Sequence, residues 1–470
     1  MINFIREDEI QKEEKSVSYA RRRRMFETDS FQEAVDKMPK CGDCWAYSSP
    51  ECPYWADNLS PETFKLAIPP ATPACRTFKP KGGEIIKPIF DSSQLLKPVH
   101  PAIGVVDGVA YVGVWLPVRI KNKGESQHEM YHLITSEREY ISCTSEKLAE
   151  IGWCLSTGPS KIKRWRLEGI KAWLSGEKPN SKEVFNRQLE VWRHYIEFPD
   201  KRYYCYVVLW ETGTYFYHLF NAYPYVYFGG VKRSGKTKAL TLLSLIAFNP
   251  VFSTDISGPS LFRLIQTARP TVLIDETEKL ANPERAQDIR SLLLSGYKRG
   301  GVAYRTEKNR REAFEVNPYE VYSPKALANI KGLDDVLEDR THTFIMRRAL
   351  GPQRDRKPDA HPETQPWVEI RDLLYRLYLH CWRDIQEIYE WLGTWEDHAK
   401  DFKASQSRID QETRSYLRKI KDEIKSRDWE LWRPILTLAI FFQHHGVQGL
   451  VKEIGELAIQ EISFKQIENM

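Results

Sequence analysis

The sequence lacks any hydrophobic run that is long enough to cross a membrane. Its most apolar stretches, residues 203–220 and 435–442, are interrupted by Glu211 and His218 or are too short. It also lacks the apolar core of a secretory signal, because acidic and basic residues follow almost directly after Met1. We therefore expect a soluble, cytoplasmic protein with no membrane partner.

A strong net charge is absent as well. The 69 Lys and Arg residues nearly balance the 64 Asp and Glu residues, which leaves a formal net charge of +5 over 470 residues. This balance gives no general argument for a nucleic-acid partner, so DNA binding would have to depend on local basic patches. The contents of 41% hydrophobic and 28% charged residues exclude a chain that is disordered or of low complexity throughout.

Cysteine is scarce outside the N-terminal region. Cys41, Cys44, Cys52 and Cys75 lie close together and begin with a CxxC pair, whereas the other cysteines are scattered singly. In a reducing compartment a CxxC group binds metal more often than it forms disulfides. Four thiolates can close a tetrahedral Zn²⁺ site, and an iron–sulphur cluster needs the same number of ligands. We expect a structural zinc site, with an iron–sulphur cluster or cysteines without metal as the alternatives.

Composition and periodicity divide the chain into six regions. These are a polar N-terminal arm (1–40), a Cys-rich metal module (41–84), a small β domain (85–142), a helical basic linker domain (143–204), an α/β core (205–350) and a helical lid or C-terminal domain (351–470). In the β domain, Asp107–Gly108 between two alternating apolar runs is a strong hairpin signal. The basic segment 161–166, which contains Trp165, suits DNA contacts, but we expect an amphipathic helix there. Later helices are expected at 367–392, 410–425 and 429–442.

An apolar strand, a glycine-rich loop and a helix follow one another in the α/β core. The loop has the pattern GxxxxGKT and consists of Gly230, Val231, Lys232, Arg233, Ser234, Gly235, Lys236 and Thr237. Glycines let such a loop wrap a phosphate chain, while backbone N–H groups and the helix N-terminus supply positive dipoles. Lys236 is expected to reach the β- and γ-phosphates, and the Thr237 hydroxyl to ligate Mg²⁺. The motif predicts binding of ATP with Mg²⁺.

A second motif places two carboxylates at the end of the apolar strand 271–274. In P-loop ATPases the first acid at such a position holds the hydrated Mg²⁺, and an adjacent glutamate can orient and deprotonate the attacking water. We assign these roles to Asp275 and Glu276. Together with Lys236, they predict an enzyme that hydrolyses ATP.

Further along, two short alternating runs flank a basic tip that contains Lys308, Arg310 and Arg311, which predicts a β-hairpin. Asn329 then ends an apolar segment, and Arg340 begins the next strand. This order of motifs resembles the AAA+ ATPases that carry a hairpin before their sensor-1 strand, a group that includes minichromosome-maintenance and superfamily 3 helicases.

The segments 323–333 and 337–340 are similar to the helicase domains of plasmid, phage and archaeal mobile-element primase-helicases. The resemblance covers about residues 205–445. It implies an α/β fold in which a P-loop AAA+ core with a parallel sheet and a C-terminal helical bundle follows the small Cys module and the small β-rich domain.

The resemblance also implies roles for individual residues. Asn329 would be the sensor-1 residue at the γ-phosphate, and Arg340 would be an arginine finger that acts on the ATP of a neighbouring subunit. Lys308, Arg310 and Arg311 would contact DNA in the central pore of a homo-oligomeric, hexameric ring. Other interpretations stay open: Asn329 as a strand-end cap, Arg340 as a surface ion pair and the hairpin tip as a solvated turn.

The function implied by the resemblance is a ring-forming DNA helicase or translocase that replicates a mobile genetic element and acts on single-stranded or forked DNA. The alternative is a nucleotide-switched DNA-binding initiator or regulator that does not translocate, and a third possibility is an ATPase that remodels protein partners. Arg427 and Arg433 are both candidates for the sensor-2 arginine. No primase catalytic acids are recognisable at 85–200.

Replacement of Cys41 or Cys44 by serine should release the metal and unfold the N-terminal module without impairing ATP hydrolysis. The reason is that all four proposed ligands precede the α/β core in the chain, so that their loss should stay local. Elemental analysis of the anaerobically purified protein measures the bound metal. Protein with neither zinc nor iron would contradict the metal module.

Overall fold

The computed structural model of the chain describes most residues after position 94. The described ranges are 95–119, 127–253, 258–275, 283–308, 314–330, 332–348, 357–362, 366–394 and 409–468. The predicted site residues outside these ranges are Cys41, Cys44, Cys52, Cys75, Glu276, Arg310 and Arg311. Their roles stay predictions. For Lys308 the backbone is described and the side chain is not.

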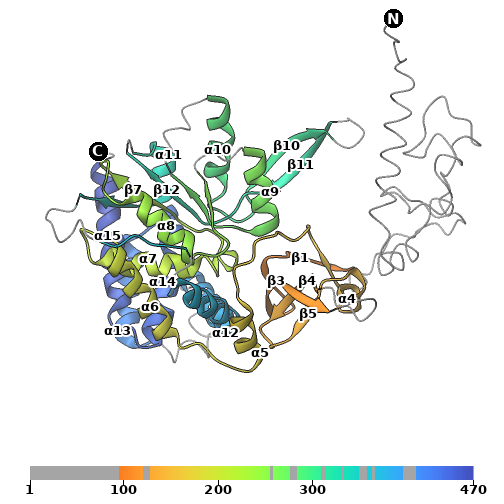
Figure 1. The fold of residues 1–470 in the computed structure, drawn as a ribbon. Coiled ribbons are helices and arrows are strands. Elements are labelled where there is room, and N and C mark those ends of the chain that lie inside the picture. The colour runs from red at the N-terminus through yellow and green to blue at the C-terminus, as the bar shows by residue number, and fades with distance from the viewer. Residues whose placement is uncertain are drawn as a thin grey trace, which may run out of the picture. The chain divides into compact units, whose positions relative to one another are not determined.

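A five-stranded parallel sheet carries the α/β part of the chain (Figure 1). Its strands are β7 (Tyr225–Gly230), β8 (Val251–Ser253), β9 (Val272–Ile274), β12 (Lys325–Asn329) and β13 (Thr341–Met346). Their order across the sheet is β13-β7-β12-β9-β8. The first strand, β7, therefore lies inside the sheet, and the second, β8, lies at one edge. The chain then returns through β9 and β12 and passes β7 to reach β13 at the other edge. In open α/β sheets, ligands bind outside the carboxyl ends of the strands, where the strand order reverses.

Helices connect these strands and surround them. Those between the strands are α8 (Lys236–Ile246), α9 (Gly258–Ala268), α10 (Pro283–Ser295) and α11 (Asp335–Glu338). Those before the sheet are α4 (Ser145–Glu150), α5 (Leu167–Leu174), α6 (Ser181–Tyr195) and α7 (Arg202–Gly213), followed by the short 3₁₀ helix η3 (Tyr217–Leu219). The C-terminal helices are α12 (Trp367–Thr394), α13 (Gln411–Glu423), α14 (Ser426–His444) and α15 (Leu450–Glu468). Within the described ranges, no helix combines the length and the apolarity that a membrane crossing requires.

Both faces of the parallel sheet are buried. Because successive side chains of a strand point to opposite faces, Tyr225 and Tyr227 join one apolar cluster, with residues of α9 and α10. Val226 and Phe228 join the other cluster, with residues of α7, α8, α12 and α14. Continuous apolar strands that are covered on both faces are typical of parallel sheets. The predicted α/β architecture with a parallel sheet and C-terminal helices is confirmed.

The predicted hairpin lies between α10 and β12. Its strands, β10 (Val302–Lys308) and β11 (Phe314–Glu320), are antiparallel, and they pair in register from Val302 with Glu320 to Lys308 with Phe314. The guanidinium group of Arg305 lies 4.4 Å from the ring centroid of Phe262 in α9. One face of the hairpin is thus held against α9, and the two strands β10 and β11 extend away from the parallel sheet (Figure 1).

A small antiparallel sheet precedes these elements. Its strands, in spatial order, are β2 (Ile103–Val106), β3 (Val109–Arg119), β4 (Gln127–Thr135) and β5 (Tyr140–Ser142). Asp107 and Gly108 join β2 to β3 with φ values of 51° and 76°, as a two-residue turn with positive φ at both positions requires. The hairpin predicted from these two residues is confirmed. The strands β1 (Lys97–Val99) and β6 (Trp153–Leu155) form a separate parallel pair.

The helix expected at residues 161–166 is wrong, because this segment has no regular secondary structure. Its side chains are instead held one by one. Trp165 stacks on Tyr375 with ring centroids 5.0 Å apart, and Arg166 Nε donates to Asp372 Oδ2 at 2.7 Å. The C-terminal helices α12, α13 and α14 are confirmed, whereas α15 was not indicated by the periodicity.

Two arginines anchor the C-terminus of α8. Arg164 Nη2 donates to the carbonyl oxygens of Ser244 and Leu245 at 2.8 and 2.9 Å, and Arg371 Nη1 donates to Leu245 at 2.7 Å. Carbonyl groups in the last turn of a helix have no partner within the helix, and cations there oppose the negative end of the helix dipole. The two arginines come from the 161–166 segment and from α12, so both segments fix the helix that follows the glycine-rich loop.

Candidate nucleotide-binding site

The glycine-rich loop connects the carboxyl end of β7 to α8, as the sequence predicts. Gly230 has a φ of 146°, and a Cβ atom at this position would overlap the main-chain oxygen of Met346 in β13. Gly235, with a φ of 92°, is the left-handed residue directly before α8. Glycine is required at both positions because other residues rarely adopt these conformations. The loop thereby leads directly into the N-terminus of a helix, where backbone N–H groups favour anions.

The ammonium group of Lys236 is held within this loop. Its Nζ donates to the carbonyl oxygens of Gly230 and Val231, both at 2.8 Å, and the residue is only 8% exposed. The positive charge therefore lies beside the backbone that starts the loop. This is the place at which a lysine can contact the phosphates of a nucleotide.

A hydrogen bond joins the two residues that the sequence predicts as Mg²⁺ ligands. Thr237 Oγ1 donates to Asp275 Oδ2 at 2.7 Å, although the residues come from the first turn of α8 and from the end of β9. Asp275 is 8% exposed. Hydroxyl and carboxylate oxygens are ligands that Mg²⁺ accepts, so the residues present here fit this ion. Within the described ranges, this site included, no group of three or more His, Cys, Asp or Glu side chains is placed to hold a metal ion.

Asn329 lies at the carboxyl end of β12, where it is in register with Gly229 of β7. Its side chain binds the turn that follows the strand: Nδ2 donates to Gly332 O at 2.8 Å, and Oδ1 accepts from Gly332 N at 3.0 Å. Oδ1 also accepts a hydrogen bond from the Tyr227 hydroxyl. The position of Asn329 suits a residue beside the nucleotide. Its hydrogen bonds, however, are those of a strand-end cap, which was the alternative interpretation of the sequence.

Arg340 lies at the amino ends of the strands, whereas the glycine-rich loop lies at their carboxyl ends. It directly precedes β13, and its carbonyl oxygen accepts from Tyr225 N at the start of β7. Its guanidinium group lies 5.2 Å from the ring centroid of Tyr297, and Nε donates to Leu294 O at 3.2 Å. Arg340 is therefore separated from the nucleotide loop of its own chain by the length of β13.

The structure brings neither sensor-2 candidate to the loop. Arg427 forms an ion pair with Asp339, the residue before Arg340. The guanidinium group of Arg433 lies 3.6 Å from the ring centroid of Tyr389, whose hydroxyl accepts from Asn221 N before β7. Both arginines therefore lie toward the amino ends of the strands.

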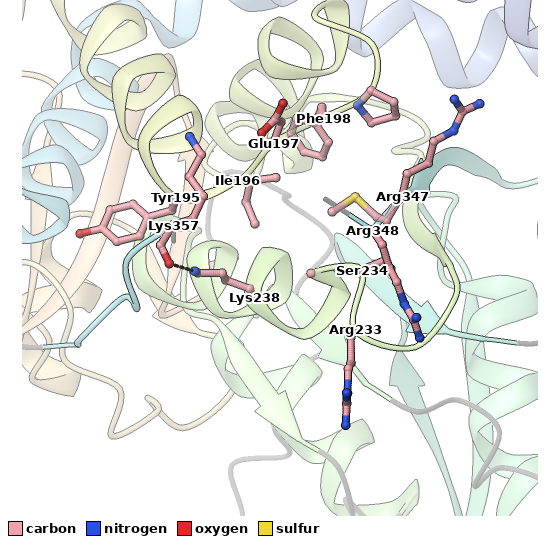
Figure 2. Close-up of a pocket in the computed structure, with 13 residues that line it drawn as sticks. Tyr195, Ile196, Glu197, Phe198, Arg233, Ser234, Lys238, Arg347, Arg348 and Lys357 are labelled. Atoms are coloured by element: carbon pink, nitrogen blue, oxygen red, sulfur yellow. Dashed lines mark hydrogen bonds between the residues drawn. The ribbon is translucent and has the colours of Figure 1, made fainter. Parts of the chain in front are cut away.

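A pocket of about 380 Å³ opens beside the loop, which is a typical size for a small-molecule site. It is lined by residues 195–199, 233–235, 346–348, Lys238 and Lys357 (Figure 2). Its charged lining residues are Glu197 and the cations Arg233, Lys238, Arg347, Arg348 and Lys357. Such an excess of positive charge suits a polyanionic ligand.

Arg347 and Arg348 are site residues that the sequence analysis missed. They follow the last residue of β13, and Arg348 Nε donates to the carbonyl oxygen of Lys232 in the loop at 2.9 Å. The signal was present in the sequence, because residues directly after a strand of a parallel sheet lie at its carboxyl edge, where ligands bind.

The side of the hairpin that carries Val302, Tyr304, Phe314 and Val316 is exposed and apolar. Tyr304 is 67% exposed and Phe314 is 71% exposed. The backbone of Lys308 is directly opposite Phe314 in the register, at the last strand pair that the structure describes before the predicted basic tip.

The chain has distant similarity to two solved structures. No protein-family model and no curated protein matches the chain. It is similar to a full-length MCM homolog from Methanopyrus kandleri, with 12% identity and a TM-score of 0.34 over 76% of this chain and 78% of that one. It is also similar to the JCV helicase, with 16% identity and a TM-score of 0.21 over 55% of this chain and 65% of that one. TM-scores this low carry no argument about function. The functional argument therefore rests on the geometry of the site.

Gly230→Ala should weaken ATP binding by about tenfold or more, which corresponds to about 1.4 kcal/mol. The added methyl group would meet the Met346 oxygen, and alanine is strained at this φ, so the loop must move. Titration calorimetry measures the affinity. Gly158→Ala is the matched control, because a Cβ there meets nothing. Unchanged ATP affinity in Gly230→Ala would show that this loop does not bind the nucleotide.

Proposed function

We propose that the chain is a Mg²⁺-dependent AAA+ ATPase that forms a ring and uses ATP hydrolysis to move along DNA. The observation that supports this most strongly is the hydrogen bond between Thr237 and Asp275 beside the loop that holds Lys236. It joins a hydroxyl and a carboxylate at the carboxyl edge of a parallel sheet, next to a helix N-terminus. This combination suits a nucleoside triphosphate with its metal ion better than any other ligand class.

In this proposal, residues 230–237 hold the phosphates through the loop backbone and Lys236. Thr237 and Asp275 hold Mg²⁺, which when bound neutralises charge on the phosphates. Glu276, directly after Asp275, orients the attacking water and accepts its proton. The cations that line the pocket beside the loop balance the negative charge of the triphosphate.

The position of Arg340 supports a role toward a neighbouring subunit. β13 has six residues, so Arg340, one residue before the strand, lies roughly 20 Å along the chain from Met346 at its carboxyl end. An arginine at that distance cannot reach the ATP of its own chain. In a ring, it would face the nucleotide site of the next subunit, where an arginine finger stabilises transition-state charge.

The hairpin supports a nucleic-acid partner. Exposed aromatic side chains such as Tyr304 and Phe314 can stack on bases, and the predicted cations at the tip can contact phosphates. Single-stranded or forked DNA in a hexameric ring is the partner that the motif order favours, and replication of a mobile genetic element is the process. A switch that binds DNA without translocating is the alternative outcome of the experiments below.

The direct test is the ATPase rate with and without single-stranded DNA. We expect DNA to raise the rate of the wild-type protein and Lys236→Ala to abolish turnover, because the γ-phosphate loses its positioned charge. Lys452→Ala, at an exposed position in α15, is the control and should hydrolyse ATP normally. Turnover that does not respond to DNA would favour the switch or an ATPase that remodels proteins.

Arg340→Ala and Glu276→Gln should each be inactive alone and partly active when mixed. An arginine that acts in trans contributes roughly 10³-fold or more to turnover, and a mixed ring contains interfaces with an intact finger and an intact base. The measurement is ATPase activity over a series of mixing ratios. The absence of recovery, when wild-type subunits are shown to exchange, would mean that Arg340 does not act on a neighbour.

A further inference from the structure

Lys325 is a fully buried lysine at the start of β12, with an exposed fraction of 0%. Its Nζ lies 3.0 Å from the carbonyl oxygens of Gly296, Val321 and Ser323, and 3.1 Å from Ser323 Oγ. These acceptors can satisfy all three N–H donors of an ammonium group. None of the hydrogen-bond partners described for Nζ is a carboxylate, and burial lowers the pKa of Lys325 well below its ordinary value.

The acceptors of Lys325 lie at the base of the β10–β11 hairpin. Gly296 follows α10 on the chain that leads into β10, whereas Val321 and Ser323 follow β11. These two segments, before β10 and after β11, are the legs of the hairpin. They are joined by hydrogen bonds from Val321 N to Gly301 O at 3.1 Å and from Ser323 N to Gly296 O at 3.2 Å. A Cβ atom on Gly296 would overlap Val321 O and would crowd Nζ. One ammonium group therefore fastens both legs of the hairpin to the sheet.

The other end of the same strand lies at the candidate nucleotide site. β12 has five residues and ends at Asn329, which is in register with Gly229 just before the loop. On its other side, Lys325 is in register with Val272 of β9, the strand that leads to Asp275. β12 is buried along its whole length and is central in the sheet. A short, rigid strand of this kind can transmit a displacement from one end to the other.

We propose that Lys325 is a positioning residue that couples the hairpin to the nucleotide site. A contact that moves the hairpin pulls on the legs bound to Nζ, and β12 carries this change to Asn329 and to the loop beside Gly229. The inference rests on the proposed function, because it presupposes ATP hydrolysis and a DNA contact on the hairpin. It adds the residue through which the two are linked.

The test compares ATPase activity and DNA affinity in Lys325→Met, which keeps a long side chain and removes the ammonium group. We expect basal hydrolysis and DNA affinity to stay near the wild-type values, because the loop and the hairpin tip are unchanged. The stimulation by single-stranded DNA should fall by about fivefold or more, the size of an ordinary coupling between sites. A role in folding alone would instead lower basal activity and both affinities together.

Lys298→Met is the matched control. Lys298 lies on the leg before β10, is exposed, and its ammonium group pairs with Glu430, which is not among the acceptors of Lys325. DNA stimulation should be normal in this variant. If Lys325→Met does not fold, Lys325→Gln takes its place, since it also removes the ammonium group, ends in a neutral amide with two N–H donors and should reduce the stimulation in the same direction.

The outcomes separate the two proposals. Wild-type protein without any DNA stimulation would contradict the proposed function and this inference with it. Stimulation of Lys325→Met, or of a folded Lys325→Gln in its place, that equals the wild-type stimulation would overturn the coupling role and leave the proposed function standing.

Discussion

Burial of both faces of the parallel sheet is the constraint on which the site depends. Alternating residues of β7 enter two separate apolar clusters, so a shift of one residue would exchange the tyrosines with Val226 and Phe228. The register of β7 with β12 and β13 is thereby fixed, and with it the place where each strand ends. Gly230 comes against the end of β13, and Asn329 comes beside Gly229, because the strands cannot slide.

The carboxyl and amino ends of the strands carry different functional residues. At the carboxyl ends lie the glycine-rich loop, the pair of Thr237 and Asp275, and the two arginines after β13. At the amino ends lie Arg340 and, at the start of β12, Lys325 under the hairpin. In the proposed ring, the carboxyl ends hold ATP, and the amino ends turn toward a neighbouring subunit and toward DNA. Individual β-strands connect the two ends, so the proposed hydrolysis would have a short path to the hairpin.

The sequence predicted the parts of this arrangement that depend on local pattern. Gly230 and Gly235 mark backbone positions that other residues cannot occupy, and Asp107–Gly108 marks a turn, so all three can be recognised without a structure. Residues 161–166 were wrongly expected to be helical, because their side chains are bound by α8 and α12, which lie far away in the chain. The roles of Lys325 and Arg348 were missed because Gly296 O, which accepts from Lys325, and Lys232 O, which accepts from Arg348, lie far from these residues in the chain.

In the proposed function, Thr237 and Asp275 hold the metal ion of a bound nucleotide. The most direct test of this assignment is calorimetric titration of ATP into the wild-type protein and into Asp275→Ala, each with Mg²⁺ and with the metal chelated. We expect Mg²⁺ to tighten ATP binding to the wild-type protein and to have little effect on the variant, because the carboxylate ligand is gone. An equal gain from Mg²⁺ in both proteins would contradict the assignment of Asp275 to the metal.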